Sequence, residues 1–251
     1  MVRTVDYETR KRAVLAAAIN RYIKEAIPVS SEEIAGDFDL SSATIRNIFS
    51  DLENDGYLTH PYTSAGRIPT NKGYRYYVDF LISQMGILDA EKEQINREYK
   101  RHVRKINRLE NIAEILDKTS EVISTFTHYA AITSFIELED RFFYKGISLI
   151  LNQPEFQDYE RIRLLIRLLE DKQQLLNVIN RDFTEKVKVF IGEELSCPEI
   201  EDCALVISSY RLKDRPVGRV AVLGPRRMEY KHTIPTLEYI SQVLTEALEE
   251  I

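Results

Sequence analysis

Apolar residues recur at helical spacing in the first part of the chain and predict a helix-turn-helix. A first helix is expected at residues 7–25. A capping box formed by Ser30 and Glu33 then predicts a second helix at 31–38. Ser41 can cap a third helix, whose apolar stripe follows the i, i+3, i+4, i+7 rule: Ile45, Ile48, Phe49 and Leu52. Two helices joined by a short turn are the arrangement that places the second helix in the major groove of DNA.

A turn-rich stretch after the third helix predicts a wing. Tyr57 and Leu58 begin a short apolar run, and residues 61–69 are rich in turn formers, as in two short strands joined by a loop. Thr70 can cap a fourth helix, which should end near residue 86. The sequence therefore predicts a winged-helix domain at residues 1–86.

Residues 87–251 predict a second domain of mixed helices and strands. A charged segment at 89–126 carries apolar residues at alternating spacings of three and four and is expected to be one long connecting helix. That helix would form a coiled coil or pack against the sheet of its own domain. Runs rich in Val and Ile predict strands at 130–136, 142–151, 186–192, 203–210 and 218–223, and helices are expected at 158–180 and 234–249. Because there is no regular βαβ repeat, we expect an α+β domain with an antiparallel sheet.

Composition and cysteine content limit the possible functions. The 251 residues, 44% of them hydrophobic, suffice for two modest cores. No apolar stretch approaches the roughly 20 residues that cross a bilayer, so we expect a cytoplasmic chain with no membrane partner. Two cysteines are too few for a disulfide framework or a zinc site and are expected to be buried thiols. The four histidines fall in no metal or catalytic spacing, and no Gly-rich phosphate loop is present, so neither a cofactor nor an enzymatic activity is expected.

The charge of the chain is unevenly distributed. A formal net charge of −6 is unusual for a DNA-binding protein, because contacts with phosphates dominate DNA affinity. The stretch 60–77, however, carries Arg67, Lys72 and Arg75 and no acidic residue. Positive charge is therefore concentrated in and after the expected wing.

The third helix presents residue types that suit base reading on the face opposite its apolar stripe. Arg can pair with guanine and Asn with adenine through two hydrogen bonds, and an Ala or Thr methyl group can contact thymine. The candidate DNA-binding residues of this helix are Ser42, Ala43, Thr44, Arg46, Asn47 and Ser50. The alternative is that these small polar residues only solvate an exposed helix face.

The expected wing and the helix after it supply further candidates. Gly66 permits close approach of the backbone to DNA, and Arg67 suits the negative potential of a narrow minor groove, which makes Arg67 the strongest single candidate. Ser64 lies in the same loop. Lys72 and Arg75 could neutralise phosphates, or could equally be surface charges.

Several short runs in both expected domains form a distinctive combination. They include Ser41-Ser42-Ala43-Thr44-Ile45-Arg46-Asn47, Thr63-Ser64-Ala65-Gly66-Arg67-Ile68-Pro69-Thr70, Leu151-Asn152-Gln153-Pro154-Glu155-Phe156 and Leu223-Gly224-Pro225-Arg226-Arg227-Met228. Together they resemble the bacterial heat-inducible transcription repressor family, which regulates class I heat-shock chaperone operons negatively. The likeness extends over nearly the whole chain.

The resemblance implies both a fold and a function. It implies a winged helix followed by a GAF-like domain, acting as a homodimer on an inverted-repeat operator in double-stranded DNA. Heat stress would relieve repression, with a chaperonin keeping the repressor in its DNA-binding form. The alternative is a winged-helix regulator controlled by a small ligand in the GAF-like domain, although candidate pocket residues such as Tyr129 are better explained by packing.

The chain departs from the family pattern at one place. Family members usually carry a small dimerisation domain inserted in the GAF-like domain, whereas here only residues 134–141 separate the flanking matches. We therefore expect a short form without this insert. The helix at 89–126 or the GAF-like sheet would then have to supply the dimer contact.

Overall fold

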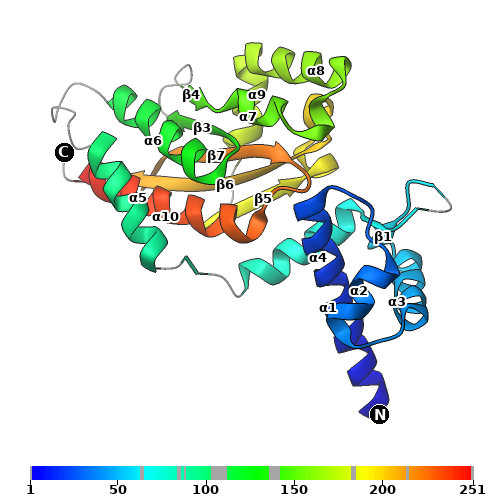
Figure 1. Ribbon diagram of the computed structural model, residues 1–251. Coiled ribbons are helices and arrows are strands. Elements are labelled where there is room, and N and C mark those ends of the chain that lie inside the picture. Colours follow the sequence, from blue (N-terminus) through cyan, green and yellow to red (C-terminus); the bar gives the residue numbers. More distant parts are fainter. Residues whose placement is uncertain are drawn as a thin grey trace. The chain divides into compact units, whose positions relative to one another are not determined.

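The chain divides into two compact units, which are described separately. The computed structural model describes residues 2–62, 65–83, 86–87, 89–102, 112–135, 142–181, 185–212 and 215–249 (Figure 1). The first unit is Met1–Ser83 and the second is Gln84–Ile251. Within these described ranges, none of the helices combines the length and apolar character needed to span a bilayer.

The first unit has the winged-helix arrangement expected from the sequence. Its elements are α1 (Val2–Glu25), α2 (Ser31–Phe38), α3 (Ser42–Asn54), β1 (Leu58–Thr59), β2 (Ile68–Pro69) and α4 (Asn71–Ile82). The strands β1 and β2 pair antiparallel, with Leu58 opposite Pro69. The helix-turn-helix and the wing are therefore both confirmed. Helix α1 begins five residues before the predicted start at residue 7.

Side-chain caps start the short helices of this unit. Ser30 Oγ accepts a hydrogen bond from Glu33 N at 3.3 Å, and the Glu33 carboxylate accepts one from Ser30 N at 2.7 Å, which completes the capping box before α2. Ser41 Oγ accepts from Thr44 N at 3.1 Å before α3. Before α4, Thr70 Oγ1 accepts a hydrogen bond from Gly73 N at 3.1 Å. Each cap satisfies an N–H group that the first turn of a helix leaves unpaired.

The second unit is built on a five-stranded antiparallel sheet. Its strands are β3 (Ala130–Phe135), β4 (Phe142–Lys145), β5 (Val187–Ile191), β6 (Cys203–Leu212) and β7 (Arg215–Pro225). They are arranged in the order β4-β3-β7-β6-β5. The prediction of an α+β fold with an antiparallel sheet is confirmed.

Helices cover both faces of this sheet. The remaining elements are α5 (Asp89–His102), α6 (Ile112–Thr127), α7 (Ile147–Leu151), α8 (Tyr159–Glu170), α9 (Lys172–Ile179) and α10 (Tyr230–Glu249), with short 3-10 turns at Pro154–Phe156, Gly192–Leu195 and Pro198–Ile200. On one face, Ile132 and Ile207 join a core with residues of α7, α8 and α9. On the other, Thr133 Oγ1 donates to Leu116 O of α6 at 2.9 Å, and Ser208 Oγ donates to Ser241 Oγ of α10 at 2.8 Å. The alternation of side chains along each strand thus separates two layers of helices.

The single connecting helix predicted at 89–126 is wrong. Tyr99 of α5 lies with its hydroxyl oxygen 3.1 Å from Thr119 Oγ1 of α6. Twenty residues of straight helix would place these side chains about 30 Å apart, so the chain must turn back between the two helices. Residues 103–111 lie outside the described residues. The apolar residues Ile95 and Leu116 are buried within the second unit, as in the alternative of packing inside its own domain.

The strand predicted at 142–151 is also too long. Strand β4 ends at Lys145, and Gly146 follows with a positive φ of 75° as the N-cap of α7. A Cβ on this glycine would lie 2.0 Å from Ser124 Oγ, so the turn needs glycine for space as well as for conformation. Helix α10 begins at Tyr230, before the predicted start at 234.

Candidate DNA-binding site

Helix α3 presents a polar surface opposite its buried stripe. Ile45, Ile48, Phe49 and Leu52 are all at most 3% exposed, and they hold the helix against the rest of the unit. On the opposite side the structure brings together four exposed candidates: Ala43, Arg46, Asn47 and Ser50. Ser42 and Thr44 are half-buried in the first turn. An exposed helix surface of this composition can reach base edges in a major groove.

Two of the hydroxyl candidates already have partners in the helix. Ser50 Oγ donates to Arg46 O at 3.1 Å, and Thr44 Oγ1 lies 2.9 Å from Ser41 Oγ of the cap. The amide of Asn47 and the guanidinium of Arg46 therefore provide the side-chain groups best suited to two-point contacts with bases.

The acidic residues of α3 and its C-cap are occupied by other groups of the protein. Asp51 accepts a short hydrogen bond from the hydroxyl of Tyr7, and Asp55 Oδ2 lies 2.5 Å from Lys11 Nζ. The bond to Asp51, followed by burial, raises the pKa of Tyr7 to about 12. Both contacts join α1 to α3. The carboxylates of Asp51 and Asp55 therefore face α1, and this arrangement favours binding of α3 to a polyanion.

The wing is joined to the loop after α1 by backbone hydrogen bonds. Val29 N donates to Arg67 O and Arg67 N donates to Val29 O, each at 2.8 Å. A Cβ on Gly66 would lie 2.6 Å from Val29 O and 2.7 Å from Pro28 O. The close approach that requires Gly66 is thus an approach to this loop, a role that the sequence analysis did not anticipate.

The side chain of Arg67 is held by Glu53 of α3. Arg67 Nη2 lies 2.8 Å from Glu53 Oε2, and the other carboxylate oxygen of Glu53 forms a short hydrogen bond with His60 Nδ1. Only 20% of the Arg67 side chain is exposed, and its Nε is buried with no hydrogen-bond partner among the described residues. Ser64, the other wing candidate, lies outside the described residues.

Sequence reasoning missed Glu53. Glu53 is 7 residues before His60 and 14 before Arg67, a spacing that would share one face of a single helix, but α3 ends at Asn54 and Gly56 and Pro61 interrupt any helix between these positions. Its only signal is an acidic residue on a helix that is expected to face DNA.

The two basic candidates of α4 make weak local contacts. Lys72 Nζ donates to Asp55 O at 2.8 Å and lies 4.6 Å from the centroid of the Tyr57 ring. Arg75 Nη1 lies 3.3 Å from Asp79 Oδ1, one turn along the helix. Surface contacts of this kind contribute about 0–1 kcal/mol, so a phosphate can compete for either cation.

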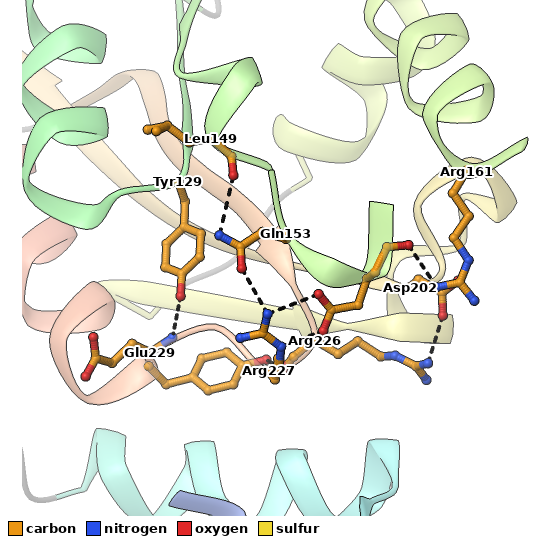
Figure 2. Close-up of polar contacts among 10 residues, drawn as sticks. Tyr129, Leu149, Gln153, Arg161, Asp202, Arg226, Arg227 and Glu229 are labelled. Atoms are coloured by element: carbon orange, nitrogen blue, oxygen red, sulfur yellow. Dashed lines mark hydrogen bonds and ion pairs between the residues drawn. The ribbon is translucent and has the colours of Figure 1, made fainter. Parts of the chain in front are cut away.

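A polar cluster in the second unit involves two of the sequence runs. Arg227 forms a two-point contact with Glu155, with Nε–Oε1 at 2.6 Å and Nη2–Oε2 at 3.2 Å, and also donates to Gln153 Oε1 at 3.0 Å (Figure 2). Asp202 lies between Arg226 and Arg161, at 2.8 Å and 3.2 Å. These groups satisfy one another, so the cluster ties the turn before α10 to the segment before α8 and gives no support to a ligand pocket.

Among the described residues we find neither a metal-binding site nor a reactive thiol. No group of three or more His, Cys, Asp or Glu residues there is placed to hold a metal ion. Cys197 and Cys203 are buried and free, as expected. Burial raises the pKa of both thiols, that of Cys197 to about 11.

Two families match the two units of this chain. Residues 7–78 match the family described as "Winged helix-turn-helix transcription repressor, HrcA DNA-binding", and residues 93–234 match "HrcA protein C terminal domain". A solved crystal structure of a hypothetical protein covers 96% of this chain and 98% of its own, with a TM-score of 0.77 and 20% identity. That likeness shows a shared fold.

Curated relatives match over nearly their full length. The heat-inducible transcription repressor HrcA of Symbiobacterium thermophilum is 30% identical, covering 95% of this chain and 98% of the relative. The protein of the same name from Carboxydothermus hydrogenoformans is 29% identical over 343 aligned residues, covering 96% of this chain and 98% of the relative. Because this chain has only 251 residues, that relative carries many residues without a counterpart here. This chain belongs to the heat-inducible transcription repressor HrcA family.

Proposed function

We propose that this chain is a transcription repressor that binds an inverted-repeat operator upstream of chaperone genes as a homodimer and releases it under heat stress. The observation that carries the proposal is the exposed polar surface of α3, on a helix whose acidic groups are occupied by the protein. The proposed repressor acts in the cytoplasm and needs neither a cofactor nor a catalytic step.

In this proposal α3 enters the major groove and reads bases. Arg46 pairs with a guanine and Asn47 with an adenine, while the methyl group of Ala43 contacts a thymine. Ser42, Thr44 and Ser50 flank these groups and contact the backbone at the groove edges.

The wing and α4 position the protein on the phosphate backbone. Lys72 and Arg75 neutralise phosphates on either side of the groove, and Ser64 contacts the backbone from the wing loop, which Gly66 holds close to the body of the unit. These contacts fix the orientation of α3 without reading sequence.

An inverted repeat requires two copies of α3 related by a two-fold axis. Two half-sites one helical turn apart place their centres about 34 Å from each other. A homodimer meets this requirement, and heat stress acts in the proposal by withdrawing a chaperonin that keeps the DNA-binding form populated. The relatives are named heat-inducible transcription repressors, which supports the connection with heat.

The proposal is tested by titrating the protein against two duplexes at two salt concentrations. One duplex carries the inverted repeat upstream of a chaperone gene of the same genome, and the other is its scrambled version. We expect a specificity ratio of roughly 10³ or more. Equal, weak and salt-sensitive binding to both duplexes would contradict the proposal.

The role of α3 is tested by Asn47→Ala. Loss of a two-point base contact should weaken binding to the inverted repeat by about 5–150-fold and leave the scrambled duplex unaffected. The matched control is Asn177→Ala, which removes an exposed asparagine of α9 whose Oδ1 accepts from Gln173 Nε2 at 3.2 Å. Equal effects of the two substitutions would exclude base reading by α3.

A further inference from the structure

One carboxylate of α3 holds both ends of the wing. His60 directly follows β1, and Arg67 directly precedes β2. The Glu53 carboxylate receives His60 Nδ1 on Oε1 and Arg67 Nη2 on Oε2, the latter at 2.8 Å. The side chains of Glu53, His60 and Arg67 are only 25%, 35% and 20% exposed, so solvent screens these contacts less than it screens an open surface pair.

We propose that Glu53 is the positioning residue of the wing and that Arg67 serves DNA binding through Glu53, without its own contact with DNA. The inference rests on the proposed function and assigns a role to two residues of the same site. Glu53 lies on α3, the helix that reads bases in the proposed function. Its contacts with His60 and Arg67 therefore fix the position of the wing relative to α3. The wing and α3 then meet the DNA backbone and the groove as one rigid surface.

Backbone contacts fix the main chain of Arg67 against the loop after α1, and Glu53 holds its side chain. Its N–H and C=O are both bonded to Val29 at 2.8 Å, and the preceding Gly66 lies against the carbonyl oxygens of Pro28 and Val29. To reach a phosphate, the guanidinium would have to leave Glu53. That would leave the partly buried Glu53 carboxylate near the phosphate charge with only its contact to His60, which is electrostatically costly.

The first measurement uses the full chain without DNA. It tests only the clamp, by which we mean the contacts of Glu53 with His60 and Arg67. In Glu53→Gln, hydrogen exchange at the Val29 and Arg67 amides should accelerate by on the order of tenfold, because the charge-assisted bonds that hold the wing are weakened. The control is Glu32→Gln, which changes an exposed glutamate in the first turn of α2. Equal exchange in wild type and Glu53→Gln would overturn the proposal.

The second measurement distinguishes positioning from direct contact on DNA. The specificity ratio between the inverted-repeat and scrambled duplexes is measured for Glu53→Gln, Arg67→Gln and the double variant. Using the ratio cancels the effect of changing net charge. We expect each single variant to lose about tenfold, equivalent to about 1.4 kcal/mol, and the double variant to lose no more than either single variant.

Salt dependence provides a readout that loss of structure alone would not move. If Arg67 contacts a phosphate, Arg67→Gln should lower the salt slope by about one counterion, while Glu53→Gln should leave the specificity ratio intact. That pair of results would overturn the proposal. If Arg67→Gln does not fold, the exchange measurement on Glu53→Gln decides. A wild-type protein that fails to discriminate between the duplexes would contradict the proposed function, whereas the exchange result would still test the clamp.

Discussion

Replacing Gly66 with alanine tests how closely the wing approaches the loop after α1. The added Cβ would lie 2.6 Å from Val29 O and 2.7 Å from Pro28 O, distances that Cβ atoms in proteins essentially never show. Both neighbours are backbone atoms and cannot rotate away. The wing must therefore move outward, and the two 2.8 Å hydrogen bonds between Val29 and Arg67 must lengthen or break.

The size of the effect follows from these two bonds. At a net value of about 0.5–1.5 kcal/mol each, their loss destabilises the wing by about 1–3 kcal/mol. The lower entropy of the unfolded alanine chain offsets about 0.4–1 kcal/mol of this. We therefore expect a net destabilisation on the order of 1–2 kcal/mol in the first unit.

Hydrogen exchange at the Val29 and Arg67 amides is the appropriate assay, because global unfolding of a chain with two units is not a single transition. The matched control is Gly36→Ala in α2, where a Cβ would meet nothing within 4 Å. That change should stabilise α2 by about 0.5–1 kcal/mol, since alanine is the better helix former. Unchanged exchange in Gly66→Ala would show that the wing is not held against the loop.

Two further predictions concern stability. The backbone N–H of Ser30, followed by its hydroxyl, lowers the pKa of Glu33 from its ordinary value of 4.5. The capping box therefore stabilises the first unit at pH values above 4.5, and this contribution is lost as the pH falls below the lowered pKa. Glu33→Gln should therefore lower the urea midpoint of the first unit at neutral pH but not in strong acid, and a difference independent of pH would contradict this. Arg227→Met breaks a pair whose side chains are only 11% and 23% exposed and should cost on the order of 3 kcal/mol in chemical denaturation of the second unit. Arg163→Met, which breaks an open pair with Glu160, should cost less than about 1 kcal/mol, and equal losses would refute the argument.

Local chemistry made the first unit predictable. Ser30 and Ser41 each cap a helix within three residues of themselves, and the stripe from Ile45 to Leu52 identifies the buried face without knowledge of the rest of the chain. Because the buried face is known, the exposed face with Arg46 and Asn47 follows from helix geometry alone.

The second unit was harder to predict because its determinants are distant in sequence. The stripe through Ile95 and Leu116 has the same spacing in one long helix as in two helices that pack on each other, and contacts between distant residues, such as Tyr99 with Thr119, distinguish the two arrangements. Likewise, the apolar residues of 142–151 suit a strand or a buried helix, and the position of Gly146 decides where one ends and the other begins.

The pairing within the candidate site was also out of reach of the sequence. Arg67 is attractive as a DNA contact because it lies in a glycine-containing turn, but its environment depends on Glu53 and Val29, which come from two other elements. Single-sequence patterns assign residue types to faces, whereas the partners of a side chain on a loop depend on how separate elements pack.

The pairing of β3 with β7 has a consequence for how the chain is synthesised. Ala130 of β3 lies opposite Leu223 of β7, which is synthesised about 90 residues later. At ordinary rates of translation, β3 therefore leaves the ribosome several seconds before β7. Until then the backbone N–H and C=O groups on the edge of β3 that will pair with β7 have no strand partner, and such an edge can pair with other chains. The DNA-binding unit is already complete at that time. A nascent copy therefore combines a finished DNA-binding surface with an aggregation-prone edge, the kind of intermediate that cellular chaperones protect.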